Sequence, residues 1–324
     1  MVIAIEVLGT VYLKTWVSLV FYESSPYMNF MKLQGIFVPN VTPFDKSGGI
    51  IEEAMADLVD YWLDAGVSGL VVNASTGEGP LLSREERQRI IELVLSLVGG
   101  RGLVIAGTGA IGTRETVELT RDALDLGADA ALVSTPFFFR PTNDELIKHF
   151  NELNGAVDLP LIFYNVPKFT GYTVAPSVVD QISKGCNNVV GIKDSSGSPS
   201  AMAENIRLFG DRINVLSGAA DMTLPTLAMG GKGAILAVAN VVPDVCVDLY
   251  RATVDGDLKE AGRLQLIISY VNKVVVRERP MVAAVKAVIS FRGFNAGIPR
   301  RPLRSLSYEE ASEVKEALKV LNII

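Results

Sequence analysis

Short apolar runs alternate with longer amphipathic stretches along the chain from Leu33 onward. The apolar runs are rich in valine, isoleucine and leucine, which is typical of strands that are buried on both faces of a parallel sheet. Eight runs of this kind predict eight strands, at residues 35–44, 69–76, 103–110, 130–139, 159–167, 188–197, 213–221 and 233–240. Strands that alternate with helical stretches indicate an α/β fold.

Two of the helical stretches have clear boundaries in the sequence. Ser83 is followed three residues later by Glu86, which is the spacing of a capping box at the start of a helix. A second helix is expected to begin at Thr113 and to end at Gly127, because glycine is the usual residue just past a helix end.

The arrangement of these units predicts one barrel rather than two domains. Eight consecutive strand–helix units without a linker favour a (β/α)8 TIM barrel over residues 33–242. No further strand pattern follows Asn240. We expect residues 243–324 to form the last barrel helix and a C-terminal helical appendage, since their pattern is helical and interrupted by prolines.

Residues 1–32 differ from the rest of the chain. The segment is apolar but contains Glu6, Lys14 and Glu23, so no uncharged run reaches the ~18 residues of a membrane span. It also lacks the basic start and the small-residue cleavage site of a signal peptide. We expect a disordered extension, or an upstream start codon used in place of Met31.

Composition narrows the class of protein. Hydrophobic residues make up 49% and charged residues 20% of the chain, which is ordinary for a globular protein with a sizeable core. A net charge of -6 without a basic run argues against nucleic acid and membrane surfaces as partners. Cys186 and Cys246 lie far apart and form no CxxC pair, so we expect no disulfide framework and a reducing, cytoplasmic setting.

Lys193 is the first candidate for chemistry. In barrel enzymes the reactive side chains lie at the carboxyl ends of the strands, and Lys193 lies near the end of an apolar strand. An ammonium among apolar neighbours is poorly solvated, which favours the neutral amine that Schiff-base formation requires. The alternative is a structural lysine that pairs with Asp194 or another acid.

Two further strand ends carry candidate groups. Tyr164 ends the fifth strand and is a candidate proton shuttle, although a tyrosine there can also serve packing alone. Ser75 and Thr76 begin a turn after the second strand, where backbone amides and hydroxyls can bind a carboxylate. Most turns of this kind only connect two elements.

Three other kinds of site find little support. Gly107, Gly109 and Gly112 match GxGxxG, but the next strand has no acidic residue at its end to hold a ribose. His149, the only histidine, lies inside a helical stretch, where we expect a surface position and no catalytic triad. The third, fourth and fifth strands end without a carboxylate or histidine, so we expect chemistry without a metal or other cofactor.

Three motifs occur in a fixed order at barrel-like spacing: Ser-Thr-Gly-Glu from Ser75, Tyr-Asn-Val-Pro from Tyr164, and Gly-Ile-Lys-Asp around Lys193. Together they resemble the dihydrodipicolinate synthase/N-acetylneuraminate lyase family of class I aldolases, from about Leu33 to the end of the chain. The resemblance implies a (β/α)8 barrel with a C-terminal helical extension, assembled as a homotetramer. It also implies a lysine Schiff base with pyruvate or a similar 2-oxo acid.

The resemblance assigns roles to five residues. Lys193 matches the Schiff-base lysine, and Tyr164 matches the tyrosine that transfers protons. Ser75 matches the hydroxyl of the proton relay, and Thr76 matches the residue that grips the carboxylate of the 2-oxo acid. Ile235 matches a backbone position that lines the pyruvate pocket.

Two substrate-binding positions depart from the family's synthases. Phe138 stands where a synthase has a tyrosine donated across a subunit interface, so the Ser75–Tyr164 relay is expected to be shortened or bridged by water. Phe169 stands where a synthase has the arginine that holds aspartate semialdehyde. We therefore expect a sugar-acid or neutral aldehyde partner, as in 2-keto-3-deoxygluconate-type or 4-hydroxy-2-oxoglutarate-type aldolases.

Two alternatives remain open at this point. One keeps the same imine and is a dihydrodipicolinate synthase-type condensation or a 2-oxo-acid dehydratase. The other is a non-catalytic barrel that binds a 2-oxo acid and has lost its relay at Phe138. In each case the expected partners are small molecules, a 2-oxo acid and an aldehyde, together with further copies of the chain.

Overall fold

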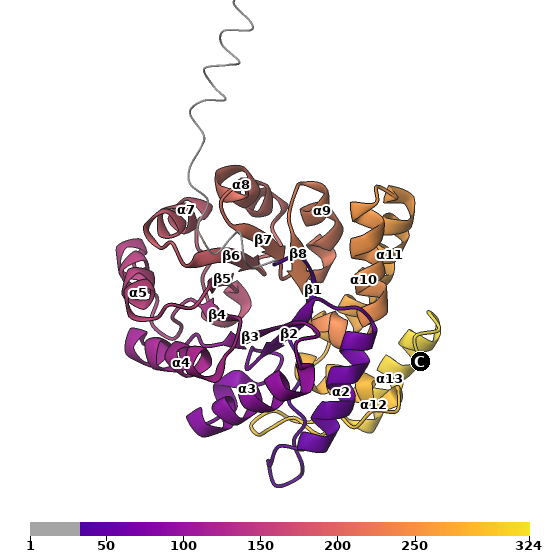
Figure 1. Cartoon of the computed structure of the whole chain (residues 1–324). Helices are drawn as coiled ribbons and strands as arrows, with labels where there is room; N and C mark the ends of the chain where they lie inside the picture. The colour runs from indigo at the N-terminus through magenta and orange to yellow at the C-terminus, as the bar shows by residue number, and fades with distance from the viewer. Residues whose placement is uncertain (1–32) are drawn as a thin grey trace, which may run out of the picture.

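The computed structural model describes residues 33–324, so the expectation for residues 1–32 lies outside the described residues. Its centre is a closed barrel in which each strand pairs in parallel with the next and β8 pairs with β1 (Figure 1). The predicted (β/α)8 barrel is therefore confirmed. The strands are β1 (Gly35–Val38), β2 (Gly69–Val72), β3 (Leu103–Gly107), β4 (Ala130–Ser134), β5 (Leu161–Asn165), β6 (Val189–Asp194), β7 (Asn214–Ser217) and β8 (Gly233–Ile235).

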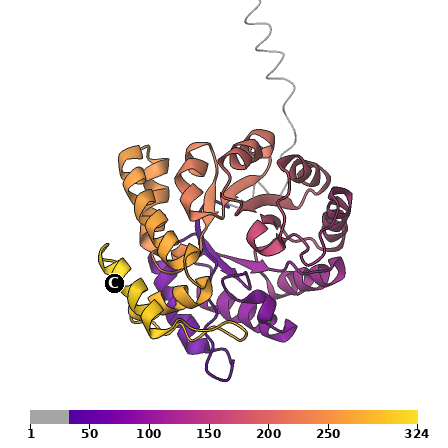
Figure 2. The ribbon, with the colours of Figure 1, turned by 180° about the vertical axis from the view of Figure 1, so that it is seen from behind.

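A ring of helices surrounds the barrel (Figures 1 and 2). Between the strands lie α2 (Glu52–Asp64), α3 (Arg84–Val98), α4 (Thr113–Leu126), α5 (Asn143–Ala156), α6 (Pro167–Thr170), α7 (Pro176–Gly185), α8 (Pro199–Phe209) and α9 (Thr223–Ala228). After the last strand follow α10 (Pro243–Val254), α11 (Leu258–Asn272), a π-helical turn at Lys273–Arg277, α12 (Met281–Phe291) and α13 (Tyr308–Lys319).

The predicted helix boundaries have the expected local causes. The Ser83 side chain accepts a hydrogen bond from the Glu86 backbone N–H at 3.2 Å, and Glu86 accepts one from the Ser83 N–H at 2.9 Å. This capping box starts α3. Gly127 ends α4 with φ at +91°, a left-handed conformation that glycine adopts without strain.

The barrel separates two apolar cores. The larger one lies between the outer face of the sheet and the helices. The smaller one fills the barrel interior with side chains that alternate with the outward ones along each strand. Its buried members include Phe37, Val71, Ile105, Leu132, Ile162, Tyr164, Leu216 and Ile235.

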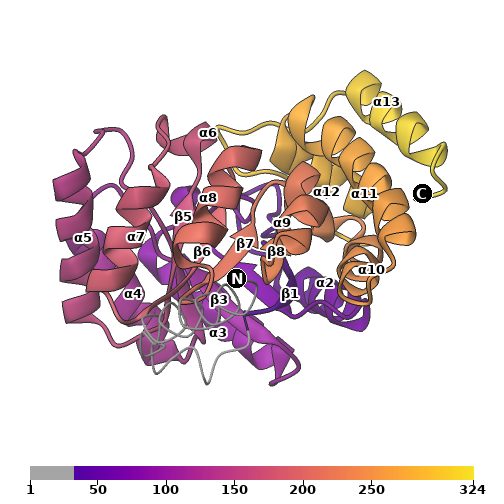
Figure 3. The ribbon, with the colours of Figure 1, turned by 90° about the horizontal axis from the view of Figure 1, so that it is seen from above.

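The C-terminal helices lie to one side of the barrel, and the chain between α12 and α13 reaches toward α6 at the barrel mouth (Figure 3). Helix α12 is apolar, and most of its residues are buried. Helix α13 packs on α12 and buries Val314 and Leu318. None of the helices in residues 33–324 is both long enough and apolar enough to cross a bilayer.

The surface position expected for His149 is wrong. The residue lies on the face of α5 that packs inward, and only 4% of it is exposed. Its Nδ1 lies 2.9 Å from the Thr113 hydroxyl, while its Nε2 has no hydrogen-bond partner among residues 33–324. Burial lowers the pKa of His149 to about 4, because the imidazolium form cannot be solvated there.

This environment predicts a loss of stability in mild acid. The pKa of His149 falls from 6.5 to about 4 on folding, so the unfolded chain binds the proton first as the pH drops. The free energy of unfolding should fall by roughly 3 kcal/mol between pH 6.5 and pH 4 because of this residue. Urea titrations of the native chain and of His149→Gln measure the difference. An equal pH slope in the two proteins contradicts the prediction.

Candidate active site

The pairing of β5 with β6 places Tyr164 directly beside Lys193. Lys193 also pairs with Leu216 on β7, and Tyr164 and Leu216 both belong to the interior core, so the lysine side chain points into the barrel. Its Nζ lies 4.3 Å from the centre of the Tyr164 ring. Only 4% of Lys193 and 7% of Tyr164 is exposed.

Asp194 does not pair with Lys193, so the interpretation of the lysine as Asp194's partner is wrong. Neighbouring residues on a strand point to opposite faces of the sheet. The Asp194 carboxylate accepts hydrogen bonds from the Asn165 side chain at 3.3 Å, the Asn205 side chain at 2.9 Å and the Ser196 N–H at 2.7 Å. Within residues 33–324, none of the ion pairs includes Lys193.

Tyr164 is the hub of a small polar cluster in the barrel mouth. Burial of the phenol opposes its ionisation, but the positive charge of Lys193 and hydrogen bonds with Ser75, Ser195 and Lys193 favour it. The net effect is that the pKa of Tyr164 lies below its ordinary value. A phenol with this tendency is suited to giving and taking a proton at the mouth.

The turn after β2 is held tightly in place. The Thr42 hydroxyl donates to the Gly77 carbonyl at 2.8 Å, and the Glu78 N–H donates to the Ser75 carbonyl at 3.2 Å. A Cβ on Gly77 would lie 2.8 Å from the Asn40 carbonyl oxygen, so only glycine fits there. Thr76, within this turn, is buried.

A cavity of about 680 Å³ opens above these residues. Its floor comes from the strand ends, and its cover comes from the segment before α12 and from the loop between α12 and α13. Of the residues predicted for the site, Ser75, Tyr164 and Phe169 line it. Its wall is mainly apolar, with cationic side chains at Arg87, Lys168, Arg279 and Arg304.

The other predicted residues do not line this cavity. Lys193 lies behind the Tyr164 ring. Thr76 and Ile235 are buried in the turn after β2 and at the end of β8. Phe138 is 84% exposed and stacks edge-on against Phe139, with ring centres 5.0 Å apart. It lies in the loop after β4 and, unlike its neighbour Phe137, does not line the cavity.

Two residues of the site were missed by sequence reasoning. Ser195 follows Lys193 and Asp194 on β6 and bonds to Tyr164. Gly218 follows β7, and a Cβ on it would lie 2.1 Å from the Ser195 Oγ and 3.0 Å from the Lys193 Cε. The only signal in the sequence was that both follow strand ends, which many residues without a role also do.

The fold and the site define a class of protein. A barrel with a buried lysine at a strand end, beside a tyrosine and a serine, is typical of enzymes that react through a lysine Schiff base. The model of the dihydrodipicolinate synthetase family matches residues 32–321. The chain therefore belongs to this family of class I aldolases and lyases, which use pyruvate through a Schiff base.

Individual relatives agree with this assignment over most of the chain. The 4-hydroxy-tetrahydrodipicolinate synthase of Geobacter sp. (strain M21) is 38% identical over 292 residues, covering 90% of this chain and 99% of the relative. The same-named protein of Methanopyrus kandleri is 35% identical and covers 90% and 98%. The crystal structure of YagE, a prophage protein of the dihydrodipicolinic acid synthase family from E. coli K12 in complex with pyruvate, is 31% identical. It superposes with a TM-score of 0.87, covering 91% of this chain and all of that one.

The close approach at Gly218 generates a prediction. Gly218→Ala should push Lys193 and Ser195 from their positions, because the new methyl group overlaps both. A displacement of this kind costs roughly a hundredfold in reactions that depend on alignment, so activity with pyruvate should fall by about tenfold to a hundredfold. The control is Gly262→Ala on α11, where a Cβ meets nothing within 4 Å. Equal activity of the two variants, both folded by circular dichroism, contradicts the prediction.

Proposed function

We propose that Lys193 forms an imine with pyruvate or a similar 2-oxo acid, and that the enzyme makes or breaks a carbon–carbon bond beside that imine. The observation that carries the proposal is the position of the Lys193 amine. It is buried, lies against the Tyr164 ring and belongs to none of the ion pairs in the described part of the chain. A lysine amine that is not held by a carboxylate is available as the nucleophile of Schiff-base formation.

The reaction follows from the groups around that amine. The Lys193 nitrogen attacks the C2 carbonyl of pyruvate, a C–N bond forms, and the carbonyl oxygen leaves as water. Loss of a proton from C3 converts the imine to an enamine, which adds to an aldehyde carbonyl; cleavage runs in reverse. Tyr164 exchanges protons with the substrate oxygen, and its contact with Ser75 supports a relay between them.

The turn after β2 is proposed to receive the carboxylate of the 2-oxo acid. Ser75 lines the cavity and contacts Tyr164, and Thr76 follows it in the rigid turn. Backbone amides and hydroxyls in such a turn bind an anion without a cation. Ile235 at the end of β8, which is separated from β2 only by β1, is proposed to line the pyruvate pocket beside this turn.

The phenylalanine at position 169 supports a neutral or sugar-derived second substrate. Phe169 lines the cavity where a synthase would hold an anionic aldehyde by arginine. The ring of Phe169 can pack against the carbon chain of a 2-keto-3-deoxy acid or a neutral aldehyde but cannot bind a second carboxylate. Phe138 adds no hydroxyl to the relay in any arrangement of subunits.

A second candidate is a condensation with aspartate semialdehyde, and the comparisons favour it over the first. The curated relatives from Geobacter and Methanopyrus are both named 4-hydroxy-tetrahydrodipicolinate synthase. The cavity also contains Lys168, whose Nζ lies 5.7 Å from the Phe169 ring centre. In this candidate Lys168 replaces the arginine as the cation that holds the aldehyde's carboxylate.

The proposal includes assembly into a homo-oligomer, a tetramer by analogy with the family. The support from this chain is the exposed aromatic pair Phe138 and Phe139, which are 84% and 73% exposed. Large apolar side chains of this kind are commonly covered in an interface.

Reductive trapping tests the Schiff base. Incubation with pyruvate and borohydride should add one reduced pyruvyl group per chain, and peptide mapping by mass spectrometry should place it on Lys193. Lys193→Met should abolish the adduct, while Lys232→Met, a lysine just before β8, should retain it. An adduct on another lysine, or none in the folded native protein, refutes the proposal.

A substrate panel separates the two candidates. On the first, kcat/KM with glyceraldehyde or a 2-keto-3-deoxy acid exceeds kcat/KM with aspartate semialdehyde. Phe169→Arg should then raise the relative preference for aspartate semialdehyde by about tenfold to a hundredfold, the value of one charge-assisted contact. On the second, the native enzyme prefers aspartate semialdehyde, and Lys168→Met should remove that preference by a similar factor. A native preference for aspartate semialdehyde over every neutral aldehyde rules out the first candidate.

A further inference from the structure

A buried ion pair joins the turn after β2 to the C-terminal appendage. Lys286 on α12 donates a hydrogen bond from its Nζ to the Glu78 carboxylate at 2.6 Å, across 208 positions of the chain. Their side chains are only 2% and 0% exposed. Glu78 directly follows Ser75, Thr76 and Gly77, so the pair is anchored at the turn proposed to bind the 2-oxo acid.

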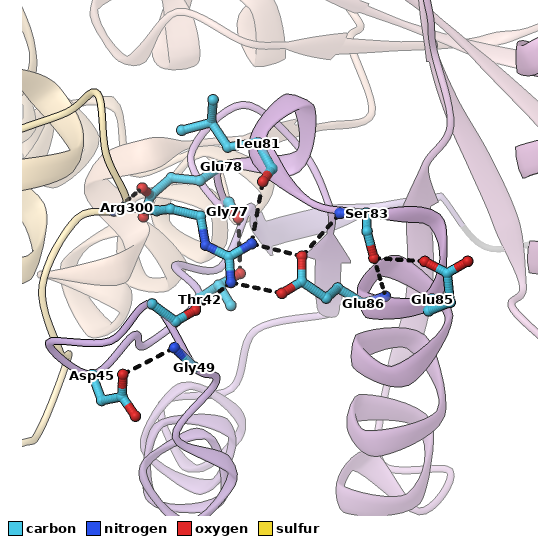
Figure 4. Close-up of polar contacts among 11 residues, drawn as sticks. Thr42, Asp45, Gly49, Gly77, Glu78, Leu81, Ser83, Glu85, Glu86 and Arg300 are labelled. Carbon is cyan, nitrogen blue, oxygen red and sulfur yellow. Dashed lines mark hydrogen bonds and ion pairs between the residues drawn. The ribbon is translucent and has the colours of Figure 1, made fainter.

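Both members of this pair make a further hydrogen bond. Lys286 also donates to the Ile298 carbonyl at 2.7 Å, and the second Glu78 oxygen accepts from the Arg300 backbone N–H at 2.7 Å. The Arg300 side chain reaches past Glu78 to Glu86 at 2.6 Å and to the Leu81 carbonyl at 3.2 Å (Figure 4). These hydrogen bonds connect the turn to the appendage and restrict the conformation of the turn.

Stability alone is a weak reason for such a pair. Burial lowers the pKa of Lys286 to about 8, although the charge of Glu78 and the hydrogen bond to it act in the opposite direction. The loss of hydration of the Lys286 ammonium thus has a larger effect on its pKa than the attraction of Glu78. Apolar residues of similar volume commonly stabilise a fold as well as a buried ion pair does.

The backbone conformation of Glu78 indicates that the ion pair stabilises the turn after β2. Glu78 has φ at +60°, a left-handed conformation that is unfavourable for a residue other than glycine. Residues are kept in such conformations where the surrounding structure fixes them, commonly next to functional sites. The conformation of Glu78 sets the direction of the preceding peptides, and the Glu78 N–H closes the turn on the Ser75 carbonyl.

We propose that Glu78 and Lys286 are positioning residues for the 2-oxo acid: their ion pair fixes the Ser75-Thr76-Gly77 turn in the orientation that binds the substrate carboxylate. This inference rests on the proposed function. It makes the C-terminal appendage part of the site, since α12 supplies Lys286 and the following loop supplies the Arg300 N–H. Neither residue contacts the reacting atoms in this account.

The test replaces both charges together. Glu78→Gln alone leaves an unpaired buried ammonium and can unfold the protein, whereas Glu78→Gln with Lys286→Met removes both charges at similar volume. The double variant should keep a melting temperature within a few degrees of the native value. Its half-saturating pyruvate concentration, measured by borohydride trapping and by turnover, should rise by about tenfold, the loss expected for one contact to a charged group. Its kcat at saturating pyruvate should fall by a smaller factor than the affinity, because Ser75 of the same turn also contacts Tyr164 in the proposed relay.

A matched control neutralises a different pair. Asp180→Asn with Arg212→Met removes a largely buried ion pair between α7 and the chain before β7, far along the barrel from the turn after β2. This control should leave pyruvate affinity unchanged. If the Glu78/Lys286 double variant is folded and binds pyruvate as the native enzyme does, the positioning role is refuted.

A second variant covers the case in which the double variant does not fold. Glu78→Asp keeps the charge but shortens the side chain by one carbon, so it should fold and pull the turn out of place. Its half-saturating pyruvate concentration should rise, and an unchanged value refutes the positioning role. Absence of any adduct in the native protein is a different result, which refutes the Schiff base itself and not only this inference.

Discussion

Closure of the parallel sheet through the β1–β8 hydrogen bonds is the constraint on which the barrel mouth depends. In a closed parallel barrel all carboxyl ends of the strands meet at one rim, so residues far apart in the chain become neighbours. The register of β5 against β6 then decides that Tyr164 and Lys193 face each other inside the barrel. A shift of one residue would turn Lys193 outward and bring Asp194 inward, which would remove the amine from the mouth.

The cavity is formed jointly by the barrel and the C-terminal appendage. The strand ends provide the floor of the cavity, whereas residues around α12 cover it and contribute Lys286 to the turn after β2. Lys193 and Tyr164 lie inside the barrel, whereas the shape of the cavity above them depends on the surrounding loops. Phe169 belongs to α6 and not to a strand, so this part of the cavity wall can vary without any change in the strand ends.

Much of this arrangement could be predicted from local sequence, and the rest depends on long-range packing. The strands, the capping box at Ser83 and the strand-end placement of Lys193 and Tyr164 follow from periodicity and from the rule for barrel mouths. The burial of His149 was also open to prediction, because Leu146, His149, Phe150 and Leu153 have the i, i+3, i+4, i+7 spacing of one helix face. Glu78 and Lys286 are 208 positions apart in the sequence, so no local periodicity indicates that they are in contact.

The most direct test of the central claim, that Lys193, Tyr164 and the turn after β2 form one site for a 2-oxo acid imine, is a crystal structure of the borohydride-trapped enzyme. Electron density should be continuous from the Lys193 Nζ to C2 of the reduced pyruvyl group. The carboxylate should lie against Ser75 and Thr76, and the Tyr164 hydroxyl should lie within hydrogen-bond distance of the adduct. Density on a different lysine, or a carboxylate held instead by the cavity's cations such as Arg279, would contradict the account.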